Sequence, residues 1–371
     1  MNVGILTFHR SNNYGAILQT YALQTVLNQL GVRSQIIDYV RPGKEESFFF
    51  PWWGLKNCII NGFTLLRYVK IRRRILRFQE FRKNFLRISS KSYYSCDELE
   101  KDIPEVDAFI CGSDQIWRPV LYDNQIRVYC LGFVNAKKVK KVAYAPSFGR
   151  SIVSKEFKQF IRPLINDIQY LSIREKTGQQ IISQATGREA QIVLDPSLLL
   201  SSEDWSRIAL PSCVDPPYVL VYCLSQRRNF CDLVRHVKKV TGLPLVVISP
   251  HALNLIRDVD RVIFDASPQK FIGLLANASC VCTNSFHATA FSIINRRPFW
   301  TTPIRLSNSR LIDLLNMIGL SDRQINSDED FPDAPLEIDY SEAERLLDEA
   351  RRNSISFLRN ALNDECDFVL S

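Results

Sequence analysis

Short apolar runs alternate with stretches of helical periodicity along the first half of this chain. Val3–Phe8 is continuously apolar, and the apolar residues of Ala16–Leu30 then recur at helical spacing up to Gly31. The remaining apolar runs predict five further strands, at Gln35–Val40, Ala108–Cys111, Val142–Ala145, Leu171–Ile173 and Ile192–Leu194. Strands that alternate with helices and compact turns predict a parallel sheet covered on both faces.

The same pattern restarts after Ser212–Pro217, a polar stretch that contains proline and suits a linker. Four more strands are predicted at Tyr218–Leu224, Leu245–Ile248, Val262–Phe264 and Cys280–Cys282, and Ser341–Leu362 has the periodicity of a long closing helix. We therefore predict an α/β protein with two doubly wound, Rossmann-like domains facing a cleft. The predicted limits are 1–212 for the first domain, 213–335 for the second and 336–371 for the closing helix.

Charge is concentrated in one segment. The formal net charge is +8, and Arg67–Arg87 holds nine Lys and Arg residues against Glu80 alone. Aromatic residues begin Phe48–Leu66 just upstream, so 43–90 is predicted to be a basic and aromatic insertion in the first domain. Its apolar run is too short to cross a bilayer, which needs about 20 residues. We expect peripheral contact of 48–87 with an anionic membrane, or else a basic helix packed on its own domain.

Composition narrows the class of protein. A length of 371 residues suits two domains, and 46% hydrophobic with 23% charged residues is typical of a globular chain with a full core. The ten cysteines include no CxxC pair, so no metal site is expected. The start MNVGILTF lacks a basic leader, which favours a cytoplasmic protein. Nucleic acid binding is not expected, because the aromatic residues flank the cations instead of interleaving with them.

Polar motifs follow several of the predicted strands. They are His9–Gly15 (HRSNNYG), Gly112–Gln115, Arg174, and the pair Ser285 and His287. In an open parallel sheet, ligands bind beyond the carboxyl ends of the strands. The last pair lies in CVCTNSFHATAF, where a strand, a polar turn and a helix start put free backbone N–H groups around an anion. The simpler alternative is that Asn284 or Ser285 caps a helix and His287 fills a polar pocket.

Several blocks together resemble the polysaccharide pyruvyl transferase family. The main block is TNSFHATAFSIINRRPF at Thr283–Phe299. The others are GILTFHRSNNYGAILQTYAL at Gly4–Leu23, ICGSDQIW at Ile110–Trp117, SIREKTG at Ser172–Gly178, LDPSLLL at Leu194–Leu200 and SRLIDLLNMIGLSDR at Ser309–Arg323. The blocks keep the family's order and span about nine tenths of the chain, so the match is specific as a set.

The resemblance implies transfer of the pyruvyl group of phosphoenolpyruvate onto a pair of sugar hydroxyls. The product would be a cyclic ketal in the repeat units of a capsule or exopolysaccharide. It also implies a fold similar to GT-B glycosyltransferases, phosphoenolpyruvate as co-substrate with no other cofactor, and an acceptor that is a lipid-linked oligosaccharide. One departure stands out. Some members carry Arg-Leu-His where this chain has Ser285-Phe286-His287, so another cation must replace the missing arginine.

Candidate roles follow from the chemistry of this reaction. The phosphate and carboxylate of the donor substrate need cations and N–H groups, for which we predict Arg174, Ser285, His287, Arg305 and Arg310. Protonation of the donor's methylene needs a general acid, predicted to be His287, because an imidazole exchanges protons near neutral pH. Asp114 is the candidate for engaging the acceptor hydroxyls and Trp117 for stacking on a sugar. The predicted acceptor-binding residues are His9, Asn12, Asn13, Gln19, Ser113, Asp114 and Trp117.

Alternatives stay open for several of these residues. Arg174 could pair with Glu175 or Glu203, Asp114 could be a turn cap, and Asp195, before Pro196, is predicted to shape a turn. At the level of function, the alternatives are a GT-B-type glycosyltransferase that uses a nucleotide sugar and a binding protein without catalysis. The chain contains no GxGxxG or P-loop motif, which counts against dinucleotide and ATP chemistry.

Overall fold

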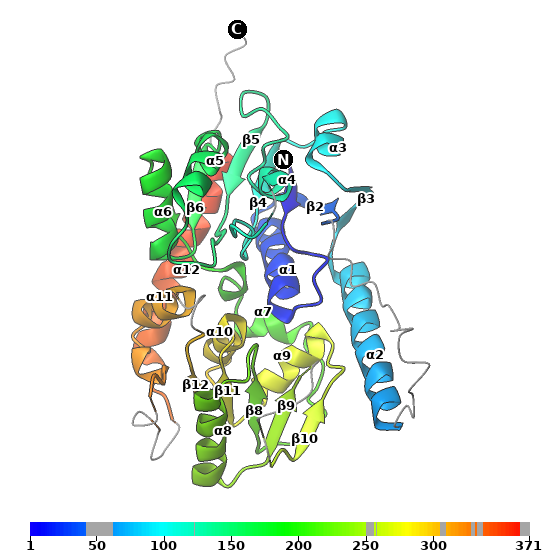
Figure 1. The fold of residues 1–371 in the computed structure, drawn as a ribbon, viewed down its shortest axis with the longest axis vertical. Helices are drawn as coiled ribbons and strands as arrows, with labels where there is room; N and C mark the ends of the chain where they lie inside the picture. Colours follow the sequence, from blue (N-terminus) through cyan, green and yellow to red (C-terminus); the bar gives the residue numbers. More distant parts are fainter. Residues whose placement is uncertain are drawn as a thin grey trace.

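Two parallel sheets follow one another along the long axis of the molecule (Figure 1). The structure is a computed structural model. It describes residues 1–41, 62–121, 123–249, 256, 258–304, 309–327, 331 and 337–363. The first sheet contains strands between residues 2 and 192, and the second contains strands between residues 219 and 301.

The first sheet has seven strands in the order β3-β2-β1-β4-β5-β6-β7. The strands are β1 (Asn2–Leu6), β2 (Arg33–Tyr39), β3 (Ile88–Tyr93), β4 (Ala108–Cys111), β5 (Lys140–Ala143), β6 (Tyr170–Ile173) and β7 (Gln191–Ile192). The helices between them are α1 (Tyr14–Gln29), α2 (Gly62–Phe85), α3 (Cys96–Lys101), α4 (Asp123–Tyr129), α5 (Lys155–Asn166) and α6 (Lys176–Thr186). The central strands β4 and β5 are buried at every position, as a sheet covered on both faces requires.

The second sheet has five strands in the order β10-β9-β8-β11-β12. Its strands are β8 (Val219–Tyr222), β9 (Leu245–Ile248), β10 (Arg261–Ile263), β11 (Cys280–Thr283) and β12 (Phe299–Thr301). Its helices are α8 (Arg228–Thr241), α9 (Pro268–Ala276), α10 (Phe286–Ile294) and α11 (Ser309–Met317). The 3-10 turns η2 (Pro196–Leu198) and η3 (Ser321–Arg323) and the helices α7 (Ser202–Ser206) and α12 (Ser341–Asn363) complete the described elements.

Strand register sets where the polar motifs emerge. Leu6 of β1 pairs with Cys111 of β4, so the segments that begin at Thr7 and Gly112 leave the first sheet at the same edge. In the second sheet Thr283 of β11 pairs with Tyr222 of β8. The carboxyl ends of the central strands therefore present their loops together, as doubly wound sheets do.

Two helices connect the two sheet units. The long helix α12 starts near the second unit, where Glu344 pairs with Arg296. It ends on the first unit, where the Ser354 hydroxyl accepts a hydrogen bond from the Leu194 N–H at 3.0 Å. On the other side of the molecule, α2 lies along both units (Figure 1), and its Arg77 donates to the backbone oxygen of Asp265.

The predicted fold class is confirmed, since two parallel α/β sheets lie in the predicted order. The predicted strands are present, and the helix predicted at Ala16–Leu30 is α1. The edge strands β3 and β12 were not predicted. The described residues of the predicted insertion 43–90 form α2 and the start of β3, so they supply a crossover within the first sheet. The domain limits stay a prediction.

Candidate functional site

The turn between β11 and α10 is built to expose the start of a helix. The Thr283 hydroxyl accepts a hydrogen bond from the Ser285 N–H at 3.0 Å, and the Ser285 hydroxyl caps α10 by accepting from the Ala288 N–H at 3.5 Å. Asn284 fixes the turn against the end of β8, because its side chain accepts from Leu224 N–H and donates to the backbone oxygen of Ser225. The capping role predicted for Ser285 is confirmed. The first turn of α10, with His287, still carries the partial positive charge of a helix N-terminus.

The start of α1 meets the start of α10. Asn13 caps α1 by accepting a hydrogen bond from the Ala16 N–H at 3.2 Å. Gly15, in the first turn of α1, lies so close to the imidazole of His287 that a Cβ atom there would be 2.5 Å from both Cγ and Cε1 of the ring. The two helix N-termini therefore converge on one place, and His287 stands between them.

Behind His287 lies a buried polar network. Asp195 is 1% exposed, and its carboxylate pairs with the guanidinium of Arg174 and accepts a hydrogen bond from the Ser113 hydroxyl at 2.9 Å. The Nε2 atom of His287 is 3.6 Å from Oδ2 of Asp195. Burial alone would raise the pKa of Asp195, but the charges of His287 and Arg174 hold it well below its usual range.

In front of His287 lies a cavity of about 310 Å³. Three arginines line it: Arg41, Arg118 and Arg310. Burial lowers the pKa of Arg310 to about 10, with the charge of Arg174 adding to the effect, and burial also lowers the pKa of Arg118. Guanidinium groups that are partly removed from water in an enclosed space favour an anionic ligand. Asn13, Asp114, Ser285 and Phe286 are among the polar and aromatic residues of the wall.

The Arg-Leu-His triplet of the resembling family has its arginine at the position of Ser285, and two arginines flank the ring of the next residue, Phe286. The guanidinium carbon of Arg174 is 4.9 Å from the ring centroid, and that of Arg310 is 5.9 Å away. Arg310 lines the same cavity as Ser285, so it brings a charge close to the place where the family arginine is missing. Arg305, the other candidate for this role, lies outside the described residues.

Asp114 reaches this cavity through an unusual backbone conformation. Its φ of 83° lies in the left-handed region that favours glycine. Its carboxylate accepts a hydrogen bond from the Gln115 N–H at 2.8 Å, so the turn role considered from the sequence is present. The side chain is only partly buried and lines the cavity.

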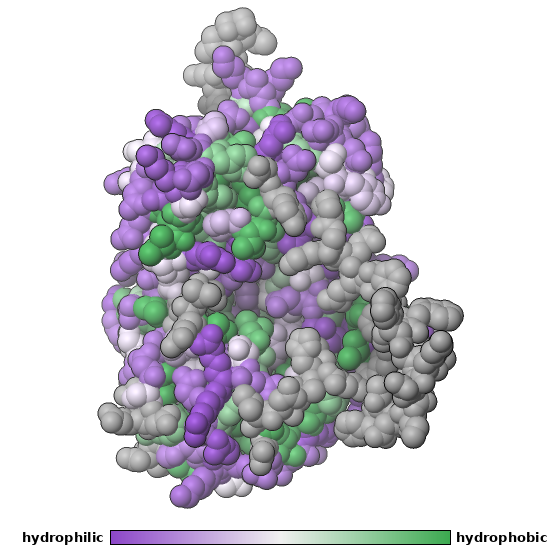
Figure 2. All heavy atoms as spheres, viewed as in Figure 1, coloured by the Kyte–Doolittle hydropathy of each residue, from purple (hydrophilic) through white to green (hydrophobic). Residues whose placement is uncertain are grey.

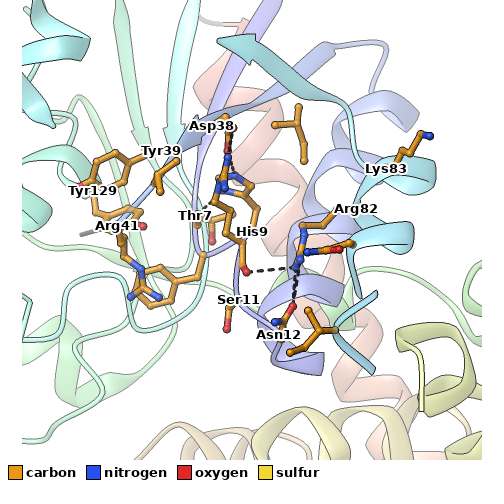
Figure 3. A pocket seen from close by; sticks show the side chains of 16 residues that line it. Thr7, His9, Ser11, Asn12, Asp38, Tyr39, Arg41, Arg82, Lys83 and Tyr129 are labelled. Carbon is orange, nitrogen blue, oxygen red and sulfur yellow. Dashed lines mark hydrogen bonds and ion pairs between the residues drawn. The ribbon is translucent and has the colours of Figure 1, made fainter. Parts of the chain in front are cut away.

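A second, larger cavity of about 850 Å³ adjoins the first and shares Phe8, Ser11 and Arg41 with it. Figure 3 shows His9 directed at Asp38, and Arg82 reaching Asn12 from α2. His9 Nε2 lies 2.8 Å from the Asp38 carboxylate, which also accepts from Arg10. Burial would raise the pKa of Asp38, but these hydrogen bonds, with one from Ser92, hold it well below its usual range. The volume of this cavity is in the range of small-molecule binding sites, and Arg10, Arg41, Arg82 and Lys83 give it a largely cationic rim.

Three predicted acceptor-binding residues do not line either cavity. Trp117 is fully buried, donates its indole N–H to the Tyr129 backbone oxygen at 3.1 Å and packs on Phe148, so it presents no face to a sugar. Gln19 is fully buried in α1 and donates to the Thr7 hydroxyl at 2.9 Å. Ser113 is fully buried against Asp195. Their polarity serves internal hydrogen bonds, which a sequence does not distinguish from ligand contacts.

Arg174 was predicted to bind the donor substrate. The structure gives it a buried ion pair with Asp195, which was not among the partners considered from the sequence. It lines a third cavity, of about 180 Å³, together with Asp195, Phe286 and Arg310, and does not line the cavity that contains His287. Its Nε and Nη2 atoms have no hydrogen-bond partner within the described part of the chain.

Sequence reasoning missed four residues of this site. Arg41 and Arg118 follow predicted strands or motifs, but isolated arginines carry no signal. Gly15 was read only as part of HRSNNYG. Asp195 was assigned to a turn, and it does cap η2 by accepting from the Ser197 N–H at 3.0 Å, but its carboxylate also faces His287.

A family model now identifies the chain. The model described as polysaccharide pyruvyl transferase matches residues 13–302, which include the start of α1, Asp195 and His287. The chain belongs to the polysaccharide pyruvyl transferase family. It is therefore a transferase of the kind that acts in polysaccharide pyruvylation, and a polysaccharide acceptor is implied for it. No protein of the curated set matches the chain in sequence.

Solved structures resemble this family member in fold. Staphylococcus aureus MnaA in its co-structure with UDP matches with a TM-score of 0.53 at 11% identity, covering 98% of this chain and 97% of that one. The N-terminal domain of Candida albicans trehalose-6-phosphate phosphatase matches with a TM-score of 0.50 at 9% identity, covering 98% and 97%. Such likenesses show the fold alone. They agree with the GT-B-like arrangement predicted from the sequence.

The basic helix α2 makes many contacts with the protein itself. Arg77 lies 3.0 Å and Arg73 3.6 Å from the Asp265 carboxylate, while Arg74 donates to the backbone oxygen of Asn12. Figure 2 shows hydrophilic residues along the left flank of one face, with hydrophobic patches in its upper middle and near its lower end. The aromatic cluster at 48–53 lies outside the described residues. Within the described chain, none of the helices has the length and apolar character needed to cross a bilayer.

Proposed function

We propose that this transferase moves the pyruvyl group of phosphoenolpyruvate onto two hydroxyls of a sugar, forming a cyclic ketal during assembly of a capsule or exopolysaccharide. The observation that supports it best is the cavity in front of His287. Two helix N-termini and three arginines converge there on a space suited to a small molecule with two anionic groups.

The donor substrate carries its two charges at opposite ends, and the cavity offers two separate cationic sides. Arg310, the start of α10 and Ser285 come from the second sheet unit, and Arg41 and Arg118 come from the first. We assign the phosphate to the α10 side, because a helix N-terminus and a guanidinium together suit a dianion. The carboxylate then faces Arg118 and Arg41. Arg174 supports this site from behind through Asp195.

The proposed reaction has three steps. His287 gives a proton to the methylene carbon of phosphoenolpyruvate, and a sugar hydroxyl attacks the adjacent carbon as it loses its double bond. Phosphate leaves with the C–O bonding electrons, and a second hydroxyl of the same sugar closes the ketal at that carbon. Asp114 lies at the cavity wall where it can accept hydroxyl protons, and the fixed arginines stabilise the departing phosphate.

The acceptor is proposed to occupy the adjoining cavity of about 850 Å³. His9, Asn12 and Arg82 lie on its wall, and Asn13 lines the cavity with His287. The two cavities share Phe8, Ser11 and Arg41, so an acceptor in one lies next to a donor substrate in the other. Since repeat units of this kind are assembled on a lipid carrier, we propose a lipid-linked oligosaccharide as acceptor.

The proposal includes peripheral contact with an anionic membrane, made by fewer cations than the sequence alone indicates. Arg74, Arg77 and Arg82 make contacts within the protein that hold their guanidinium groups, whereas the side chain of Arg73 is 56% exposed despite its ion pair with Asp265. Each exposed cation of α2 and of the segment after it would contribute about 1 kcal/mol to the free energy of membrane binding. These cations include Arg72, Lys83 and Arg87. Flotation with anionic and with neutral vesicles tests this, because a helix that only packs on its own protein floats with neither.

The nucleotide-sugar alternative rests on the fold shared with the UDP-bound MnaA structure and on no particular residue of this site. The two functions differ in the product that is released. Phosphate released from phosphoenolpyruvate, together with a sugar that has gained a pyruvyl group, supports the proposal. Release of a nucleotide from a sugar nucleotide, with phosphoenolpyruvate unchanged, would refute it.

A further inference from the structure

The two ring nitrogens of His287 have different surroundings. Nε2 points towards the buried side, where Oδ2 of Asp195 is 3.6 Å away, and it has no hydrogen-bond partner among the residues that the structure describes. Nδ1 lies on the other side of the ring, next to Gly15 in the first turn of α1. The imidazole is therefore held between two elements of the first sheet unit, although it belongs to the second.

Asp195 is surrounded by groups that donate to it. Its Oδ1 accepts from the Ser197 hydroxyl at 2.6 Å and from the Ser197 N–H, and its Oδ2 accepts from Ser113 and Arg174. A carboxylate in such a setting is ionised and can only accept. A neutral imidazole that turns Nε2 towards this oxygen is stabilised when Nε2 carries the proton, and it is destabilised when Nε2 carries a lone pair.

We propose that Asp195 is a positioning residue that fixes the Nε2–H tautomer of His287 and leaves Nδ1 as the atom that exchanges protons with the substrate. The assignment of the tautomer stands on the geometry alone, while the catalytic consequence rests on the proposed function. Arg174 acts in the same device. Its guanidinium pairs with the Asp195 carboxylate and keeps that carboxylate ionised. The proton between Asp195 and His287 then belongs to the imidazole.

The separation of 3.6 Å is longer than a hydrogen bond, so at this distance the carboxylate acts on Nε2 through its charge. The contact also joins the two sheet units, since Asp195 caps η2 after the first sheet and His287 starts α10 in the second. A small movement of one unit towards the other would close it.

The direct test is ¹⁵N NMR of the imidazoles in the full chain at alkaline pH, where a histidine ring is neutral. The chain has four histidines, at 9, 236, 251 and 287, so loss of one signal set in His287→Gln assigns the ring. We expect a protonated Nε2 and an unprotonated Nδ1 in the wild type. A predominant Nδ1–H tautomer, or equal populations, would overturn the proposal, whatever the enzyme's activity.

Variants test the role of Asp195 itself. In Asp195→Asn we expect the tautomer preference to be lost and kcat to fall by about 10²-fold or more, with the KM for phosphoenolpyruvate changed by less than about threefold. Ser113→Ala is the matched control, because it removes a hydrogen bond from the same oxygen and keeps the charge. It should keep the tautomer and retain kcat within about threefold.

An unchanged tautomer and an unchanged kcat in a folded Asp195→Asn protein would refute the role. Should that variant fail to fold, because Arg174 is left unpaired, the wild-type spectrum still decides the tautomer. Absence of any pyruvyl transfer by wild-type protein that shows the Nε2–H tautomer would count against the proposed function and leave the positioning role intact.

Discussion

Gly15→Ala should abolish most activity, although it adds a single methyl group to a helix. The new Cβ would lie 2.5 Å from Cγ and Cε1 of His287 and closer still to Nδ1, whereas real Cβ atoms essentially never approach within 3.0 Å. The imidazole must therefore move by about 1 Å, because helix α1 is packed and its backbone cannot yield easily. A displacement of that size in a catalytic group costs roughly 10²-fold in rate, or about 2.7 kcal/mol of transition-state stabilisation.

Stability should respond differently from activity. Alanine is favoured over glycine in helices by up to about 1 kcal/mol, which opposes the cost of moving the ring. Replacing His287 by alanine separates the helix preference for alanine from the cost of moving the imidazole. In a His287→Ala background, the further change Gly15→Ala should raise the free energy of unfolding, because the three atoms nearest to the new methyl group all belong to the ring that has been removed.

The assay combines phosphate release from phosphoenolpyruvate with urea unfolding, for the two single variants and the double variant. Gly178→Ala serves as control, since a Cβ there is also crowded, 2.7 Å from Ile173, and Gly178 lies away from the cavities described here. That variant should lose stability and keep its KM and kcat. Wild-type turnover by Gly15→Ala would refute the reasoning, because it would mean that the exact place of His287 does not matter.

Two further predictions concern donor binding by Arg310 and the loss of folding stability in acid. Arg310→Ala should raise the KM for phosphoenolpyruvate about ten- to a hundredfold, because a charged hydrogen bond to an anion contributes about 1.5–3 kcal/mol; an unchanged KM in steady-state kinetics would remove it from the donor site. Asp38 has a pKa held below its ordinary value of 3.8, so its carboxylate stabilises the fold fully above that pH and progressively less as the pH falls towards the folded-state pKa. Urea unfolding of the wild type should therefore show stability falling below about pH 5, with a shallower fall in Asp38→Asn, and identical slopes would contradict this.

The fold was predictable from sequence because its strands are continuous apolar runs. Strands such as Ala108–Cys111 and Cys280–Thr283 are fully buried, and such runs separated by helical periodicity leave little choice of architecture. The edge strands were harder. β3 (Ile88–Tyr93) is half exposed and reads ISSKSY, so it has no apolar run, and its pairing to β2 comes from the tertiary fold.

The candidate site was predictable only in part. His287, Ser285 and Asp114 were found because each follows a strand end, a position that the fold itself turns towards the cleft. Ser113 and Trp117 follow the same strand end as Asp114, but their side chains point inwards to Asp195 and Tyr129. The side chains of neighbouring residues at a turn point in different directions, and these directions depend on backbone geometry that the sequence pattern does not reveal. Asp195 was missed for the same reason, because its contact with His287 joins residues from different sheet units.

The most direct test of the central claim compares phosphoenolpyruvate with a nucleotide sugar as donor substrate in one assay. Purified wild-type protein is incubated with a panel of free and lipid-linked sugars and either phosphoenolpyruvate or a nucleotide sugar, and the products are followed by mass spectrometry and phosphate release. The account predicts a pyruvylated sugar and an equal amount of phosphate with phosphoenolpyruvate, and loss of both in a folded His287→Ala protein. Transfer of a sugar from the nucleotide donor, with phosphoenolpyruvate unreacted, would contradict it.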